Sequence, residues 1–421
     1  MIAEWRKKPV VLLLCIAFCC IPWAQGALIP GLGGYLTISS LCLLVGSVYA
    51  AIDRLNTSRP LVPRSFFEIP VVICILVYFA IGLASYFFAA EQLPFLKEAI
   101  QRCILILAPL YLFSMGPKRP EDLKKAFYWL MFMSSIMSII VFEEGVRIGF
   151  SAPVYALDLH KNQIAGTCSV TAVIAIACLL TSSDSKRRFM FTIFLVIALL
   201  GCVASQGRAG FLCTIVATFF MLIARRASLK QITKFVLSVA LVSVAIVHFM
   251  PKEVIENATS TKKNSNQVRL LVWTELYPIL SRKPFSPVGW GNGLFVGSIL
   301  YHDVANVLLY DWMQMSILGP LALLSIIFFA IKLTLDNASR MPTNTYLSFV
   351  NLIALGIICT RFTHGMLDTF WIGRGCNLCT FMGIGLAVYV KLLLDQQQQI
   401  RRLSNQMRAA GPARIPQKLA A

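Results

Sequence analysis

Long apolar runs separated by short polar segments form the main pattern of this chain. The core of a lipid bilayer is about 30 Å thick and needs about 20 apolar residues for each helix that crosses it. Twelve runs of about that length recur, so the pattern predicts an all-α polytopic membrane protein with about 12 transmembrane helices. The predicted spans are residues 9–26, 31–51, 67–89, 99–115, 125–147, 161–182, 188–205, 208–224, 232–250, 305–331, 345–363 and 367–392.

The composition supports this class, because 57% of the 421 residues are hydrophobic and only 14% are charged. We expect a single membrane-embedded domain over residues 1–421. The first apolar run, after Arg6-Lys7-Lys8, resembles a signal peptide, but the spans that follow favour an uncleaved helix. The thirteen cysteines lie mostly inside apolar runs, where a thiol behaves as a small buried hydrophobe, so no disulfide framework is expected.

The net charge of +19 reports topology rather than a nucleic-acid partner, because Lys and Arg collect in cytoplasmic loops. Of the 38 Lys and Arg residues, 25 fall in the alternate loops that include both termini, counting Lys391 just before the C-terminal tail, and 13 fall in the other set and its flanking residues. This split predicts cytoplasmic termini, with a polar tail over residues 393–421. The segments expected on the far side are 90–98, 148–160, the 206–208 turn, the long loop 251–304, and 362–368.

The long loop contains an Arg-x-x-x-Trp pair followed by a Gly-rich turn. Arg269 and Trp273 would share one helix face, a placement that suits either a sugar-phosphate ligand or a stacked surface pair. The turn PVGWGNG (287–293) is no dinucleotide fingerprint, since no strand-turn-helix unit surrounds it. Its glycines allow backbone geometry that is closed to other residues.

Two cations stand where predicted helices enter the membrane on the far side. Arg208 follows the tight turn SQG and opens a span. An ionisable residue there is costly and indicates function, although it could also reach lipid headgroups. A guanidinium binds phosphate with two parallel hydrogen bonds. Lys161, after His160, also suits phosphate, or it anchors the helix at the interface.

All four histidines (His160, His248, His302 and His364) are expected on the far side, where a side chain that titrates near neutral pH could transfer a proton. His302, beside Asp303, suits a general base or an exposed loop residue. Two further arginines, Arg361 and Arg374, flank His364. Burial of Arg374 would require Asp368 or an anionic ligand as its partner.

This face is rich in cations and carries no clustered carboxylates of the kind that hold Mg²⁺ or Mn²⁺. The pattern therefore predicts that the protein alone stabilises an anion, without a metal or another cofactor.

The turn SQGRAG, the run RLLVWTELYPILSRKPFSPVGWGNG and the helix NVLLYDWMQMSILGPLALL together resemble the O-antigen ligase/polymerase family. The resemblance covers mainly residues 155–330, and HKNQIAG at 160–166 is also similar to some members. It implies a GT-C-type glycosyltransferase of the bacterial inner membrane, with its active site in a periplasmic loop. The family's ligases move a finished glycan from undecaprenyl pyrophosphate to lipid A-core of lipopolysaccharide, in a reaction regarded as metal-independent.

The family's important residues are an Arg in the turn, an Arg in the long loop and a His near the end of that loop. The resemblance assigns these roles to Arg208, Arg269 and His302. The usual His directly precedes Asn, but Ala305 takes that place here, so His364 is a rival for the base. Substrate-binding roles are expected for Lys161, His160, Trp273, His364, Arg361 and Arg374.

Three alternatives remain at this stage. A polymerase would use the same lipid-linked donor with a second lipid-linked glycan as acceptor. A protein-glycosylating relative usually carries a longer C-terminal region than the one here. A transporter or flippase of lipid-linked sugars would place charges along the middle of several helices, whereas most polar groups here gather at one face.

Overall fold

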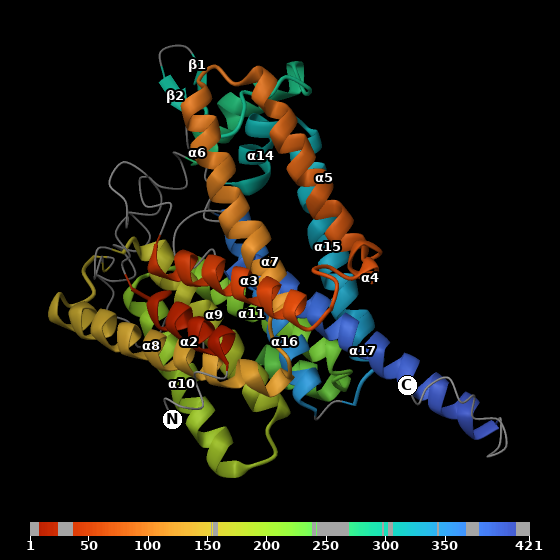
Figure 1. The fold of residues 1–421 in the computed structure, drawn as a ribbon. Helices are drawn as coiled ribbons and strands as arrows, with labels where there is room; N and C mark the ends of the chain where they lie inside the picture. Colours follow the sequence, from red (N-terminus) through yellow and green to blue (C-terminus); the bar gives the residue numbers. More distant parts are fainter. Residues whose placement is uncertain are drawn as a thin grey trace.

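The computed structural model describes residues 8–23, 37–152, 154, 159–237, 241, 269–296, 299–301, 306–342, 345–367 and 379–409. Within them the protein is a bundle of helices (Figure 1), which confirms the predicted all-α membrane class. The elements are α2 (Pro9–Cys20), α3 (Ile38–Asn56), α4 (Arg64–Phe67), α5 (Pro70–Ala84), η1 (Ser85–Phe88), α6 (Gln92–Arg102), η2 (Cys103–Leu107), α7 (Ala108–Met115), α8 (Pro120–Arg147), α9 (Lys161–Thr181), α10 (Ser185–Ala204), α11 (Arg208–Ala224), β1 (Leu294–Val296), β2 (Ile299–Tyr301), α14 (Val307–Met315), α15 (Leu318–Ser339), α16 (Tyr346–Leu367) and α17 (Cys379–Ala409).

Nine helices within the described residues are long and apolar enough to cross a membrane, and α2 and α11 are shorter apolar helices. The predicted span 232–250 lies mostly outside the described residues, so the expected number of twelve stays a prediction. Several helices begin at a proline, including Pro9, Pro70 and Pro120. Proline suits the first helical turn, because its missing N–H would have no partner there.

The predicted span 305–331 is wrong, because the chain forms two helices there instead of one. α14 ends at Met315, and Ser316 takes a left-handed backbone conformation with φ +66° before α15 begins. Pro320 explains the break, since in a continuous helix its ring would clash with the carbonyl of Ser316. The ring of Pro109 would likewise clash with the carbonyl four residues before it in a regular α-helix. The π-helical turn η2 lies at this point, between α6 and α7.

The expectation that residues 362–368 form an exposed link is also wrong. α16 continues to Leu367, and His364 in its last turn is buried. The apolar residues Phe362 and Met366 pack against the core, so the helical pattern extends beyond the predicted end at 363. The segment 90–98 is helical from Gln92, where α6 begins, and it remains largely exposed, with Leu93 at 63% and Leu96 at 51%.

The described part of the long loop contains a helix over 269–282 and a small hairpin. β1 and β2 pair antiparallel, with Leu294 opposite Tyr301. Only short helices were expected here, and three-residue strands give too short an alternation to be recognised from sequence.

Charged contacts join the loops at one end of the bundle, which we call the basic end (residues 52–64, 116–124, 225–231, 339–342 and 395–407). Asp53 pairs with Lys118 at 2.8 Å, and Arg340 pairs with Asp395 at 2.8 Å. Arg226 donates to the carbonyl of Ser339 at 3.4 Å. These loops all belong to the set that the charge count assigned to one side.

Different hydrogen bonds join the segments of the other set, at what we call the site end (residues 90–94, 148–152, 204–208, 286–296, 306 and 364–367). The Glu91 N–H donates to the Asn292 side chain at 2.9 Å, and the Gln206 amide donates to the carbonyl of Phe150 at 2.9 Å. The loops therefore alternate between two ends, as the charge count requires. Which end faces the cytoplasm stays a prediction.

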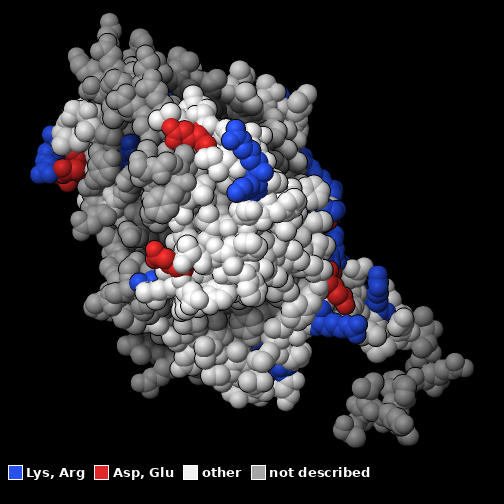
Figure 2. All heavy atoms as spheres, turned by 90° about the horizontal axis from the view of Figure 1, so that it is seen from above, with Lys and Arg blue, Asp and Glu red and all other residues white. Residues whose placement is uncertain are grey.

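The surface agrees with burial in lipid. Figure 2 shows broad areas of one face without described Lys, Arg, Asp or Glu side chains, while the charges lie in small separate groups. Large apolar side chains are exposed on several spans, among them Phe189 at 70% and Phe328 at 63%. Such exposure is costly in water but favourable against lipid tails.

Candidate active site

The turn before Arg208 packs directly on helix α9. A Cβ added to Gly207 would lie 2.2 Å from the Cβ of Ala165, and one added to Gly210 would lie 2.9 Å from the Ala165 carbonyl oxygen. Only glycine allows so close an approach of the two backbones. Arg208 is exposed and is the first residue of α11. The close packing of the turn therefore holds Arg208 beside the beginning of α9.

The beginning of α9 is fixed by His160, which caps the helix. Its Nδ1 accepts a hydrogen bond from the N–H of Asn162 at 3.3 Å, and its own N–H donates to the Gln163 side chain at 3.1 Å. Burial lowers the pKa of His160, and the positive charges of Lys161 and Arg269 lower it further. His160 thus has a structural role in addition to the predicted substrate-binding role, which stays a prediction.

Arg361 and His364 lie buried one turn apart on α16, with 0% and 1% of their surfaces exposed. The Arg361 guanidinium lies 3.0 Å from His364 Nδ1, and its Nε lies 3.5 Å from the Thr380 hydroxyl of α17. Helix α9 covers this pair at Gly166, where an added Cβ would lie 3.0 Å from the His364 ring and 3.1 Å from Arg361. Ala165 and Gly166 therefore join the Arg208 turn to the Arg361–His364 pair.

The helix over 269–282 brings the loop arginine to the same place. Arg269 is partly buried and acts electrostatically on both His160 and His364. This helix packs on α14, where Trp273 lies against the cluster formed by Leu276, Leu280 and Met313. Trp273 therefore helps to seat the helix that carries Arg269.

The Gly-rich turn is anchored on the other side of the loop. Trp290 is fully buried and lies against Phe79 of α5 and Phe95 of α6. Gly289 and Gly291 have φ of +87° and +73°, which favour glycine. The turn fixes the shape of the loop, as expected from its glycines, and none of the predicted cationic residues lies in it.

A buried charged cluster below this turn was not predicted from the sequence. Arg102 of α6 lies 4.7 Å from the centre of the Trp290 ring, bonds to Glu98 at 2.8 Å, and donates to the Tyr78 hydroxyl at 2.6 Å. That hydroxyl donates to Asp311 of α14 at 2.9 Å. A signal was present, because Arg102 and Asp311 each lie inside a predicted span, where charge is costly unless it is paired.

Two predicted residues, His302 and Arg374, lie outside the described residues, together with Asp303 and Asp368. The nearest described residue after His302 is Asn306. Its side-chain amide donates to the carbonyl of Met366 at 3.1 Å. The end of the long loop therefore meets the last turn of α16, two residues beyond His364.

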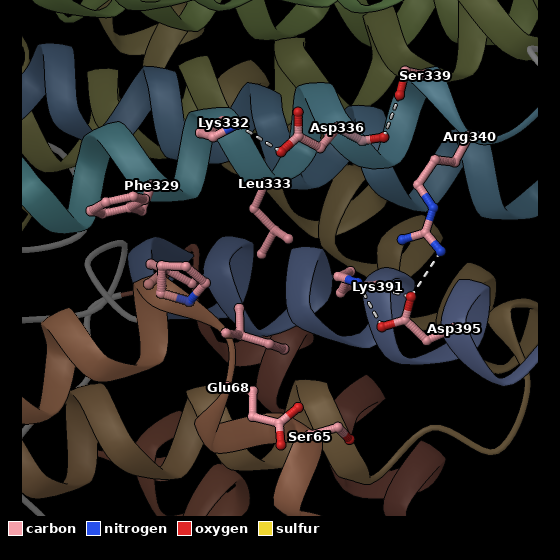
Figure 3. A pocket seen from close by; sticks show the side chains of 13 residues that line it. Ser65, Glu68, Phe329, Lys332, Leu333, Asp336, Ser339, Arg340, Lys391 and Asp395 are labelled. Atoms are coloured by element: carbon pink, nitrogen blue, oxygen red, sulfur yellow. Dashed lines mark hydrogen bonds and ion pairs between the residues drawn. The ribbon is translucent and has the colours of Figure 1, made fainter.

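A cavity of about 550 Å³ lies at the basic end, away from these residues (Figure 3). Its lining cations already have acidic partners, since Lys332 lies 3.1 Å from Asp336, and both Arg340 and Lys391 contact Asp395. It contains none of the predicted site residues, so we place the candidate active site at the other end.

The fold and these contacts define a multi-pass membrane protein with a cluster of cations at one end. Residues 193–316 match the family model described as O-antigen ligase, so this segment is similar to that family, which confirms the resemblance. The matched segment contains Arg208, Arg269 and the Gly-rich turn. A search among curated proteins gave no match to the chain.

Proposed function

We propose that this protein is an O-antigen ligase, a membrane glycosyltransferase that transfers a polysaccharide from undecaprenyl pyrophosphate to lipid A-core. The observation that carries the proposal is the convergence of Arg208, Lys161 and Arg269 around the beginning of α9. Arg208 and Arg269 lie within the matched segment. These three cations suit a pyrophosphate leaving group, which gains negative charge as its bond to the sugar breaks.

The proposed reaction is a direct displacement at the anomeric carbon. The acceptor hydroxyl oxygen bonds to this carbon while the bond to the pyrophosphate oxygen breaks, and the electron pair leaves with the pyrophosphate. His302 takes the hydroxyl proton, in the role of general base. Attack from the side opposite the leaving group inverts the configuration. Arg208 and Arg269, with Lys161, neutralise the departing charge.

The surroundings of the reaction are part of the same proposal. The protein spans the bacterial inner membrane, the site end faces the periplasm, and both termini lie in the cytoplasm. The apolar surface of the bundle contacts the polyprenyl tail and membrane lipids. The reaction is proposed to need no metal, so transfer should continue in the presence of a chelator such as EDTA.

Deletion of the gene, followed by electrophoresis of lipopolysaccharide, tests the proposal. Loss of all ladder bands, with glycan accumulating on its lipid carrier, supports a ligase. A band with a single repeat unit would instead identify a polymerase. An unchanged ladder would exclude both for that polysaccharide, and glycan trapped on the cytoplasmic leaflet would point to a flippase.

A further inference from the structure

The hydrogen bond between Arg361 and His364 determines which ring nitrogen of His364 carries the proton. The Arg361 Nη1 lies 3.0 Å from His364 Nδ1. A guanidinium can only donate hydrogen bonds, so Nδ1 must be the acceptor and carries no proton. A neutral imidazole then holds its single N–H at Nε2.

The charged form of His364 does not fit this arrangement. Protonation would place an N–H at Nδ1 pointing toward the N–H of Arg361, and would bring a second positive charge within 3.0 Å of the guanidinium. Both side chains are fully out of water, where repulsion between like charges is strong. Arg269 adds a further positive charge to the same environment.

The Nε2–H is therefore a fixed donor, and it has no hydrogen-bond acceptor among the described residues. Leaving a buried donor without a partner destabilises a protein, so such groups usually have a role. His364 is enclosed by Gly166 of α9 and lies two residues before Met366, where the end of the long loop docks. It is therefore next to the cations assigned to the leaving group.

We propose that His364 binds an anionic phosphate oxygen of the lipid-linked donor through its Nε2–H, with Arg361 as the residue that fixes this tautomer, and that His364 is not the general base. This assignment rests on the proposed function. It makes Arg361 a positioning residue, and it removes the rival to His302.

Substitution of His364 by Gln or Asn distinguishes a hydrogen-bond donor from a general base. In His364→Gln the side-chain amide nitrogen takes the place of Nε2 and can donate, but it cannot accept a proton near neutral pH. In His364→Asn the amide reaches only the place of Nδ1, so it keeps an acceptor for Arg361 and loses the donor. Both side chains are polar, and neither is larger than His. Each variant therefore serves as the folding control for the other.

The test measures transfer and binding by the purified full-length protein in lipid nanodiscs. We expect His364→Gln to retain most of the transfer rate and an unchanged pH profile. His364→Asn and His364→Ala should each lose roughly 10- to 100-fold, the usual range for a hydrogen bond to a charged group. If Gln is as inactive as Ala while both variants are folded, or if all three are fully active, the assignment is wrong.

Binding of a fluorescent polyprenyl pyrophosphate separates failure of this assignment from failure of the proposed function. Binding to the wild type that weakens in His364→Asn and recovers in His364→Gln supports the assignment. Equal binding to the wild type and His364→Asn overturns it alone, whereas no binding to the wild type overturns the ligase proposal as well. Displacement by inorganic pyrophosphate supports a pyrophosphate site, while displacement by phosphatidylglycerol alone would show a lipid-headgroup site and contradict the assignment.

Discussion

Asn306 and Met366 join the end of the long loop to the end of α16. The Asn306 amide donates to the Met366 carbonyl at 3.1 Å, while its Oδ1 accepts from the N–H groups of Leu308 and Leu309 and caps α14. One side chain therefore begins a helix and also holds the loop against the buried His364.

Two substitutions of Asn306 separate these tasks. Asn306→Asp keeps the capping oxygen but lacks the donor to Met366, so we expect near-normal thermal stability with reduced transfer. Asn306→Ala removes both and should lower stability by about 1 kcal/mol, the typical value of a helix cap. Thermal unfolding in detergent and a transfer assay measure the two effects. Full activity of the Asp variant would show that the link to Met366 does not position the site.

Arg208 should not be replaceable by Lys. If its guanidinium binds the pyrophosphate with two hydrogen bonds, Arg208→Lys should lower transfer by roughly 10²- to 10³-fold, the range for removing one donor from an anion-stabilising site. Arg226→Lys is the matched control, because Arg226 lies just beyond the other end of α11 and its guanidinium donates to the carbonyl of Ser339. An active Arg208→Lys variant would favour simple anchoring to lipid headgroups.

The contact between Gly207 and Ala165 can be tested by compensation. In Gly207→Ala the new Cβ would lie 2.2 Å from the Cβ of Ala165, so the turn must move and carry Arg208 with it. Transfer should fall although no charge is lost. The double variant Gly207→Ala/Ala165→Gly removes the clash and should recover activity, as expected for residues in direct contact. Additive losses in the double variant would contradict the proposed geometry.

We predict that the Arg102 cluster stabilises the protein by anchoring the Gly-rich turn of the long loop. Arg102→Met leaves Asp311 buried with its main cationic partner gone, and breaking such a pair costs roughly 3–5 kcal/mol. We expect a clearly lower unfolding temperature together with protease cleavage of the loop near Trp290, because the cation under its ring is also lost. Arg119→Met, at the basic end, is a control for the loss of one positive charge. Equal stability of the two variants would show that the cluster does not anchor the loop.

The sequence predicted the class of fold, most of the helix positions and the alternation of the loops, because apolar length and cation counts report directly on the bilayer. It did not predict the break at Ser316, since Pro320 is tolerated in a first helical turn and the surrounding residues are uniformly apolar. It also placed His364 in an exposed link, with Arg361 near it, because a histidine beside a predicted helix end looks solvated until the covering helix is known.

Among the predicted site residues, the structure brings Arg208, Lys161, His160, Arg269, Arg361 and His364 together around the beginning of α9. Their grouping depends on glycines at 166 and 207, and residues so far apart in sequence give no local signal of such contacts. Trp273 instead packs on α14, and His302 and Arg374 lie outside the described residues. Their roles stay predictions, and the role of His302 is the one on which the proposed proton transfer depends.

Reconstituted transfer tests the central claim most directly. The purified protein is incubated in vesicles with an undecaprenyl-pyrophosphate-linked glycan and lipid A-core, with EDTA present, and the product is resolved by electrophoresis. We predict that the wild type forms glycosylated lipid A-core and that Arg269→Ala forms almost none, while both still bind membranes and remain folded. Absence of product from the wild type, or equal product from both proteins, would contradict the account.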